Sequence, residues 1–124
     1  MIETKSIPKP NEGTGLWLLK ILSGALIIVL LLVHFIVNHY APEGALLTWE
    51  GVVAYYANPW IVLMEIIFLV VVVTHALIGM RSIILDLNPS KRIMGVIDWL
   101  MVLIGTVSVI YGVWLALTVA AFSA

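Results

Sequence analysis

Three long and almost uncharged apolar segments constrain this chain more than any other feature of its sequence. They run from Leu16 to Tyr40, from Trp60 to Met80 and from Trp99 to Val119. Each exceeds the ~20 residues that an α-helix, rising ~1.5 Å per residue, needs to cross a hydrocarbon layer about 30 Å thick. Backbone groups in lipid must find their hydrogen-bond partners within the segment, so separate spans of this kind are helical. The sequence therefore predicts an all-α integral membrane protein with three transmembrane helices.

The composition supports the same prediction. Of the 124 residues, 63% are hydrophobic and 10% are charged, and a water-soluble domain of this size could not hide so much apolar surface. The net charge of −1 gives no indication of nucleic-acid binding. Because the chain has no cysteine, it has no disulfide, no iron–sulfur ligand and no covalent haem attachment of its own. The first apolar run starts late and is too long for a cleaved signal peptide.

The expected boundaries follow from the charged and turn-forming residues. We expect transmembrane helices near residues 16–40, 60–87 and 92–119, which together with their loops form one membrane domain over residues 16–124. A polar arm, residues 1–15, precedes them. It contains two prolines and two glycines, so no helix is expected in it.

The first loop between the spans is rich in aromatic residues. Within it, Trp49, Val52, Val53 and Tyr56 recur at helical spacing. This pattern predicts a short helix over residues 47–56 that lies on the membrane interface.

Every basic residue lies at one end of the predicted bundle, either before or at the start of the first span or between the second and third spans. These residues are Lys5, Lys9, Lys20, Arg81, Lys91 and Arg92. The positive-inside rule then places the N-terminus and the second loop in the cytoplasm and the C-terminus outside. We therefore expect a multi-pass protein of a prokaryotic cell (inner) membrane.

The second span carries a polar stripe. Asp86 follows His75 by eleven residues, or about three helical turns, so it lies almost directly below the imidazole. Gly79 and Ser82 lie between them, and a glycine one turn from a histidine leaves room for a flat, bulky group. Arg81, ~9 Å along the helix from His75, lies at the inner boundary and is placed to meet an anionic group. An imidazole, free space and a nearby cation are what a haem with propionates requires.

The first span offers a second intramembrane histidine near the outer surface. His34 lies at a depth similar to that of Glu65, and roughly 12 Å from His75 along the membrane normal, given a ~30 Å layer. Two interpretations are open at this point. His34 forms a hydrogen bond with Glu65 and does nothing else, or it belongs to a separate outer site.

The third span carries small residues three and four positions apart, on one face of the helix. They are Gly105, Ser108, Gly112 and Ala116. Small residues let helices approach closely in lipid, so a helix partner is expected, in this chain or in another.

Three stretches of the sequence together resemble the small membrane-anchor subunits of succinate dehydrogenase (complex II). The family pattern has an R-x-S-G-like start to its first helix, in some branches a histidine later in that helix, and H-x3-G-x-R-x4-D in the second helix. Here these read "KILSG", His34 and "HALIGMRSIILD". The size, the three spans and the cytoplasmic N-terminus also fit, so the resemblance covers nearly the whole chain.

The resemblance implies roles for individual residues. His75 matches the axial ligand of haem b, with the opposite ligand on a partner subunit, and Arg81 lies beside it for the propionates. Asp86 matches the acid near the quinone pocket, and Ser23 falls in the region facing that pocket. His34 matches branches that hold a second, outer haem, so that the iron ligands of this chain would be His75 and His34.

Two positions depart from the family pattern. Ile21, with Lys20 beside it, stands where a basic residue usually precedes the S-G pair, and Leu87 stands where a tyrosine often follows the aspartate. A phenol donor to the quinone would then have to come from the partner subunit.

The resemblance also implies an assembly. The chain would be a non-catalytic anchor that packs in the lipid membrane against a second membrane-anchor subunit. An iron–sulfur subunit and a flavoprotein subunit would dock on its cytoplasmic face, and electrons would pass to a quinone, the substrate of this site. The alternatives are a cytochrome b anchor of fumarate reductase or another respiratory dehydrogenase, and a haem-free structural subunit. A transporter is disfavoured, since the spans lack broken helices and repeats.

Overall fold

The computed structural model describes residues 12–40 and 45–123, and this part of the chain consists of helices and short connections, with no strand. Its elements are α1 (Thr14–His39), a 3-10 turn η1 (Ala45–Leu47), α2 (Trp49–Tyr56), α3 (Pro59–Asp86) and α4 (Lys91–Ala121). The helices α1, α3 and α4 are each long and apolar enough to cross a membrane. The predicted all-α membrane fold with three spanning helices is confirmed. Of the polar arm expected over residues 1–15, residues 1–11 lie outside the described part, and α1 begins at Thr14.

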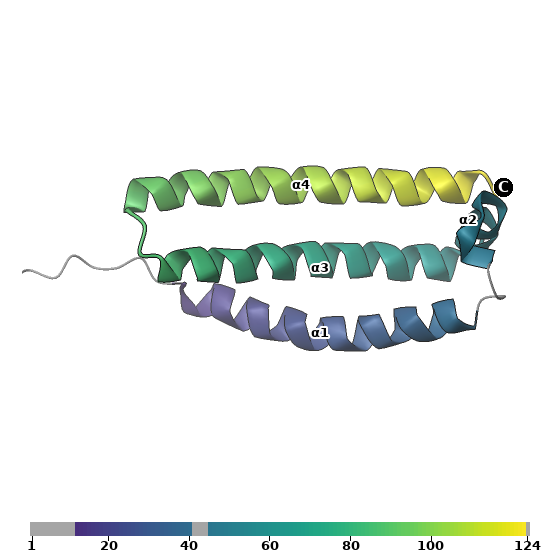
Figure 1. Cartoon of the computed structure of the whole chain (residues 1–124), viewed down its shortest axis with the longest axis horizontal. Helices are drawn as coiled ribbons and strands as arrows, with labels where there is room; N and C mark the ends of the chain where they lie inside the picture. Colours follow the sequence, from purple (N-terminus) through teal and green to yellow (C-terminus); the bar gives the residue numbers. More distant parts are fainter. Residues whose placement is uncertain (1–11, 41–44, 124) are drawn as a thin grey trace, which may run out of the picture.

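Side-chain caps fix where the helices after the first begin. The Asn58 side chain accepts a hydrogen bond from the Trp60 amide at 3.0 Å, and Pro59 occupies the first turn of α3. Ser90 accepts from the Ile93 amide at 3.3 Å at the start of α4. Between these helices Asn88 has a φ of 55°, a left-handed conformation that asparagine tolerates better than most residues. The short α3–α4 turn makes these two helices antiparallel neighbours (Figure 1).

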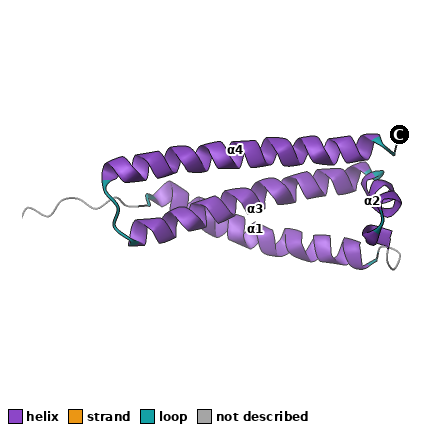
Figure 2. Ribbon diagram, turned by 45° about the horizontal axis from the view of Figure 1, so that its top comes forward, coloured by secondary structure: helices purple, strands orange, loops and turns teal. Residues whose placement is uncertain are grey.

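In the view of Figure 1 the three long helices form a layer with α3 in the middle, and Figure 2 shows α1 crossing behind α3. The central helix packs against both α1 and α4, whereas the backbones of α1 and α4 do not approach one another closely. The short helix α2 lies across the end of the layer where the C-terminus is found, and it contacts α3 and α4. Because α3 alone has a long helix on each side, its polar residues can be bonded from two sides within the chain.

A layer of this kind buries little of its own surface. The buried apolar residues of the described part are Val62, Ile78, Met94, Ala116 and Val119. Large apolar side chains along all three spans are exposed. Lipid or other protein subunits must therefore cover most of the surface of the spans.

Small residues of α4 pack directly against α3. A Cβ added to Gly105 would lie 2.6 Å from Leu77 Cδ1, and one added to Gly112 would collide with the side chain of Leu69. Ala116 on the same face is 8% exposed. The partner of the small-residue face therefore lies within this chain, a question that the sequence left open. The close approach replaces the hydrophobic driving force that is missing between helices in lipid.

We predict that Gly112→Val destabilises the α3–α4 pair by about 1–3 kcal/mol, the usual cost of overpacking a filled contact. The measurement is the free energy of unfolding of the purified chain in mixed micelles titrated with sodium dodecyl sulfate. Gly95→Val is the matched control, because Gly95 lies on the same helix and a Cβ there meets no atom within 4 Å. Equal effects of the two substitutions would contradict the packing argument.

Candidate functional site

His75 of α3 is held by the Ser-Gly pair of α1. Its Nδ1 lies 3.0 Å from Ser23 Oγ, and Ser23 is 6% exposed. A Cβ added to Gly24 would lie 3.1 Å from His75 Cε1. Ser23 thus bonds the imidazole, and the missing side chain of Gly24 lets α1 pass close to the ring. The structure brings together two of the predicted site residues, Ser23 and His75, across the α1–α3 interface.

The hydrogen bonds of Ser23 indicate which imidazole nitrogen carries the proton. Ser23 Oγ also lies 3.1 Å from the backbone carbonyl oxygen of Lys20. A carbonyl only accepts and a hydroxyl has a single hydrogen, so Ser23 donates to Lys20 and accepts from His75. We therefore assign the proton of the neutral imidazole to Nδ1. The Nε2 atom is then left with a free lone pair.

Below His75 the same side of α3 offers space and then a polar cluster. A Cβ added to Gly79, about one turn from His75, would meet no atom within 4 Å. Further along, Lys20 Nζ lies 2.7 and 2.8 Å from the two carboxylate oxygens of Glu12 and donates to Ser82 Oγ at 2.9 Å. Ser82 in turn donates to Glu12. Lys20 is therefore the cation in contact with this side of α3.

Glu12, which precedes α1, is the acidic member of that cluster. Hydrogen bonds from Lys20 and then Ser82 hold the pKa of its carboxyl below the ordinary value. A lowered pKa in the folded state means that the stabilisation is present above the unfolded-state pKa and is lost as pH falls through the folded-state pKa. Sequence reasoning missed Glu12 because it lay in the polar arm, in which no helix was expected.

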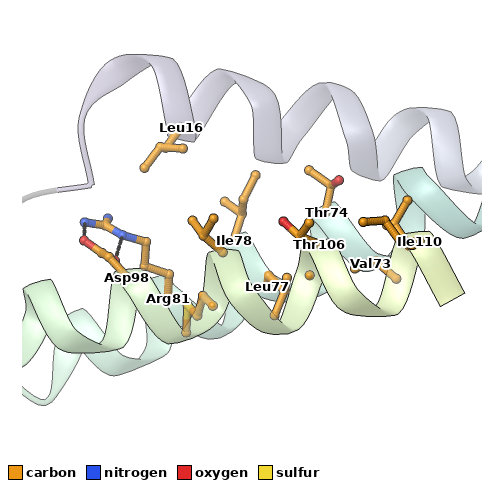
Figure 3. A pocket seen from close by; sticks show the side chains of 13 residues that line it. Leu16, Val73, Thr74, Leu77, Ile78, Arg81, Asp98, Thr106 and Ile110 are labelled. Carbon is orange, nitrogen blue, oxygen red and sulfur yellow. Dashed lines mark hydrogen bonds and ion pairs between the residues drawn. The ribbon is translucent and has the colours of Figure 1, made fainter.

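The side chain of Arg81 bonds to α4, on the other side of α3 from α1. Its Nε and Nη2 donate to the two carboxylate oxygens of Asp98 in α4, at 2.7 and 3.1 Å (Figure 3). This forked geometry is the strong form of an arginine–carboxylate pair. His75 bonds to α1 and Arg81 bonds to α4, so the structure does not bring these two predicted site residues together. Asp98 was missed, although a carboxylate just before the apolar run of the third span was a usable signal.

Asp86 is the last residue of α3 and its side chain is exposed. Within the described part of the chain it forms no ion pair with a basic residue, and the neighbouring Lys91 and Arg92 are exposed as well. It therefore does not join the Glu12 cluster, although both lie at the same end of the molecule.

A second polar cluster lies at the other end of α1. His34 Nδ1 lies 2.9 Å from Glu65 Oε1, and the Tyr55 hydroxyl of α2 donates to the same oxygen at 2.7 Å. Asn38 Nδ2 donates to the His34 carbonyl at 2.7 Å and to the Tyr55 hydroxyl at 3.3 Å. Burial, and then the hydrogen bond to Glu65, raise the pKa of Tyr55 well above its ordinary value. The His34–Glu65 hydrogen bond, one of the two interpretations above, is formed, and it occupies Nδ1 rather than Nε2.

The described residues form no group of three or more histidine, cysteine, aspartate or glutamate side chains that could hold a metal ion. The two intramembrane histidines are instead single residues in separate clusters at opposite ends of the spans. Iron bound at either one would need a cofactor to carry it and a ligand from elsewhere.

The fold and the two clusters define a class: a multi-pass helical membrane subunit whose intramembrane histidines are held between neighbouring helices. Residues 3–124 match the family described as succinate dehydrogenase/fumarate reductase transmembrane subunit, and the chain belongs to this family. It is 33% identical over 119 residues to the succinate dehydrogenase hydrophobic membrane anchor subunit of Archaeoglobus fulgidus, across 96% of this chain and 100% of that protein. No solved structure matches the chain. The resemblance to succinate dehydrogenase anchors is therefore confirmed, and the chain is a membrane-anchor subunit of this family.

We predict that Tyr55→Phe loosens α2 from α3. The Phe variant removes one donor from Glu65, and a hydrogen bond to a charged group contributes about 1.5 kcal/mol or more, so protection of the α2 amides should fall by about tenfold. Hydrogen–deuterium exchange of the protein in nanodiscs measures this. Tyr56→Phe is the control, because the Tyr56 hydroxyl makes no hydrogen bond to a described residue. Unchanged α2 exchange in Tyr55→Phe would show that the hydrogen bond does not hold the helix.

Proposed function

We propose that this chain is the hydrophobic anchor subunit of a succinate:quinone oxidoreductase, and that it binds haem b through His75 Nε2. The observation that carries the proposal is the hydrogen bond between Ser23 and His75, because it keeps the proton on Nδ1 and the lone pair on Nε2. Metal-ligating histidines commonly donate their other ring nitrogen to a fixed acceptor in this way. Membership of the family supports the same assignment.

The residues around His75 fit a haem. Gly79 leaves open space one turn below the imidazole. Lys20 is a cation on the same side, but Glu12 and Ser82 take its donors, so a propionate would have to displace one of them. Haem b, when bound, supplies one-electron transfer. Arg81 was expected to meet the propionates, but it is engaged by Asp98 on the far side of α3, and the proposal does not depend on it.

A second protein ligand to the haem iron would come from a partner in this proposal. The chain has three histidines; His34 belongs to the cluster at the other end of α1, and His39 is exposed in the last turn of that helix. Neither lies on the α3 turns around His75. We assign the second ligand to a second membrane-anchor subunit, which would cover part of the exposed apolar surface.

The iron–sulfur and flavoprotein subunits would dock at the end of the layer that holds Glu12, Lys20 and the α3–α4 turn. We place this end in the cytoplasm, because the basic residues gather there. Labelling of a Lys91→Cys variant only from outside would contradict this orientation.

A second haem at His34 stays a prediction. The Glu65 bond to Nδ1 fixes the imidazole in an orientation that keeps Nε2 available. Two haems per assembled complex would support this assignment. One haem per complex would leave the His34–Glu65 pair as an interhelical hydrogen bond only.

A haem-free structural subunit is the alternative that the observations favour next. Both intramembrane histidines are hydrogen-bonded across the α1–α3 interface, to Ser23 and to Glu65, and such bonds can hold helices together without any cofactor. The absorption spectrum of the purified complex separates the two functions. A cytochrome b anchor of fumarate reductase would give the same spectrum and differ in the direction of catalysis.

For the quinone site we propose the cytoplasmic end of α3, between the region of Ser23 and Asp86. Asp86 is exposed and forms no ion pair with a described residue, so its carboxylate is accessible to water and can exchange protons. A carboxylate so placed can pass protons to a quinone as it is reduced.

We predict that His75→Ala removes the low-spin haem spectrum from the assembled complex, whereas the matched change His39→Ala leaves it intact. Ser23→Ala should keep the haem but raise its reduction potential, because the lost hydrogen bond makes the imidazole a weaker donor to iron. Optical redox titration measures both effects. An unchanged spectrum in assembled His75→Ala would refute haem ligation by this residue.

We predict that Asp86→Asn slows quinone reduction by about tenfold or more, since positioned proton transfer contributes roughly 10²–10⁴-fold to such reactions. Succinate oxidation with a soluble artificial acceptor should continue at the wild-type rate. Glu50→Gln, at an exposed carboxylate of α2, is the control. If both activities of assembled Asp86→Asn equal those of the wild type, Asp86 is a surface charge only.

A further inference from the structure

Glu12, which precedes α1, ties the start of that helix to α3. Its two carboxylate oxygens lie 2.7 and 2.8 Å from Lys20 Nζ, and the Ser82 hydroxyl of α3 donates to it. The side chains of Lys20 and Glu12 are 24% and 20% exposed. The ion pair is therefore only partly buried, and another charged group can reach it from the surface.

The backbone at Gly13 connects this carboxylate to the helix that it folds back onto. Gly13 has a φ of 75°, in the left-handed region that glycine adopts at little cost. A Cβ added there would meet no atom within 4 Å, so the conformation, and not the available space, favours glycine. The Gly13 carbonyl accepts a backbone hydrogen bond from the Trp17 amide of α1 at 3.1 Å. The contact between Glu12 and Lys20 thus depends on one left-handed residue.

The Glu12 cluster lies on the side of α3 that carries His75. Ser82 follows His75 by seven residues, or about two helical turns, so the two side chains share a stripe of the helix. Gly79, between them, leaves open space. On α1 the Lys20 carbonyl accepts from Ser23, which bonds the imidazole. A group that binds at His75 and extends along this stripe therefore reaches Lys20.

Lys20 cannot hold a second carboxylate while it holds Glu12. An ammonium group has three N–H donors. Two point to the carboxylate oxygens of Glu12 and one to Ser82 Oγ. A propionate that comes to Lys20 has to take the place of Glu12, because a carboxylate needs the same donors and two carboxylates repel one another.

We propose that Glu12 competes with a haem propionate for Lys20, so that haem binding releases Glu12 from α1 and α3. The inference rests on the proposed binding of haem at His75. Exchange of one carboxylate for another keeps the Lys20 charge paired in both states. It also links occupancy of the haem site to the position of Glu12, at the end of the layer where the iron–sulfur and flavoprotein subunits are proposed to dock.

The test measures the rate at which the assembled complex loses haem to an excess of apomyoglobin. Glu12→Gln removes the competing charge, so it should slow haem loss by about tenfold, the worth of one charge-assisted hydrogen bond. Affinity differences of this kind appear mostly in the dissociation rate. Glu50→Gln, at an exposed carboxylate of α2, is the control and should lose haem at the wild-type rate.

A double variant shows whether Glu12 acts through Lys20. In a Lys20→Gln background the further change Glu12→Gln should have no effect on haem loss, since the two residues are in direct contact and their effects should not add. Haem loss from Glu12→Gln that equals or exceeds the wild-type rate would overturn the inference. Glu12 would then be only a clip between α1 and α3.

Gly13→Ala keeps the test decisive if Glu12→Gln does not assemble. It leaves every side chain of the cluster in place but penalises the left-handed backbone that presents Glu12, so haem loss should slow by about fivefold or more. Gly15→Ala is the matched control, because its Cβ also meets no atom within 4 Å and its φ is not left-handed. Equal rates in the two alanine variants would contradict the competition.

Failure of the haem proposal itself would look different. Haem retained unchanged by His75→Ala, or a wild-type complex that contains no haem, would refute haem binding at His75 and this inference with it. Haem lost from His75→Ala, together with wild-type haem loss from Glu12→Gln and Gly13→Ala, would refute the competition alone.

Discussion

A polar side chain inside a bilayer has no water to bond to, and this constraint organises the arrangement of the three spanning helices. α3 carries a histidine, a glutamate and an arginine, and each is bonded to a neighbouring helix. His75 and Glu65 bond to α1, whereas Arg81 bonds to α4. The central position of α3 therefore allows this chain to bond all three side chains from within, although Arg81 Nη1 finds no acceptor among the described residues.

Within this frame, two kinds of contact join the helices. The α1–α3 interface is fastened by hydrogen bonds at both ends, through Ser23 and through His34. The α3–α4 interface combines one ion pair with the close approach at Gly105 and Gly112. Such contacts replace the hydrophobic effect, which does not drive association between helices already surrounded by lipid. The interfaces between neighbouring helices are packed, but the broad apolar outer faces of the layer remain open to lipid and partner subunits.

A hydrogen bond that joins α1 to α3 also orients the side chain of His75, the proposed haem ligand. By accepting a hydrogen bond from Nδ1, Ser23 favours the imidazole tautomer whose Nε2 carries a free lone pair. By contrast, Asp86 is the last residue of α3 and its side chain is exposed, so it can exchange protons with water. A half-buried, hydrogen-bonded imidazole and an exposed carboxylate on one helix are what the proposed electron transfer at depth and proton uptake at the surface require.

The sequence alone determined the number of spans, their approximate ends and the family. Hydrophobic length is a local property of a segment, and the spacing of His75, Gly79 and Asp86 is set by one helix. The sequence could not say which neighbouring helix packs against a given side of that helix. Only the tertiary structure decided that Arg81 bonds to Asp98 and that the small residues of α4 pack on α3. Helical periodicity assigns a residue to a face, but the partner across that face comes from a distant part of the chain and depends on how the helices pack.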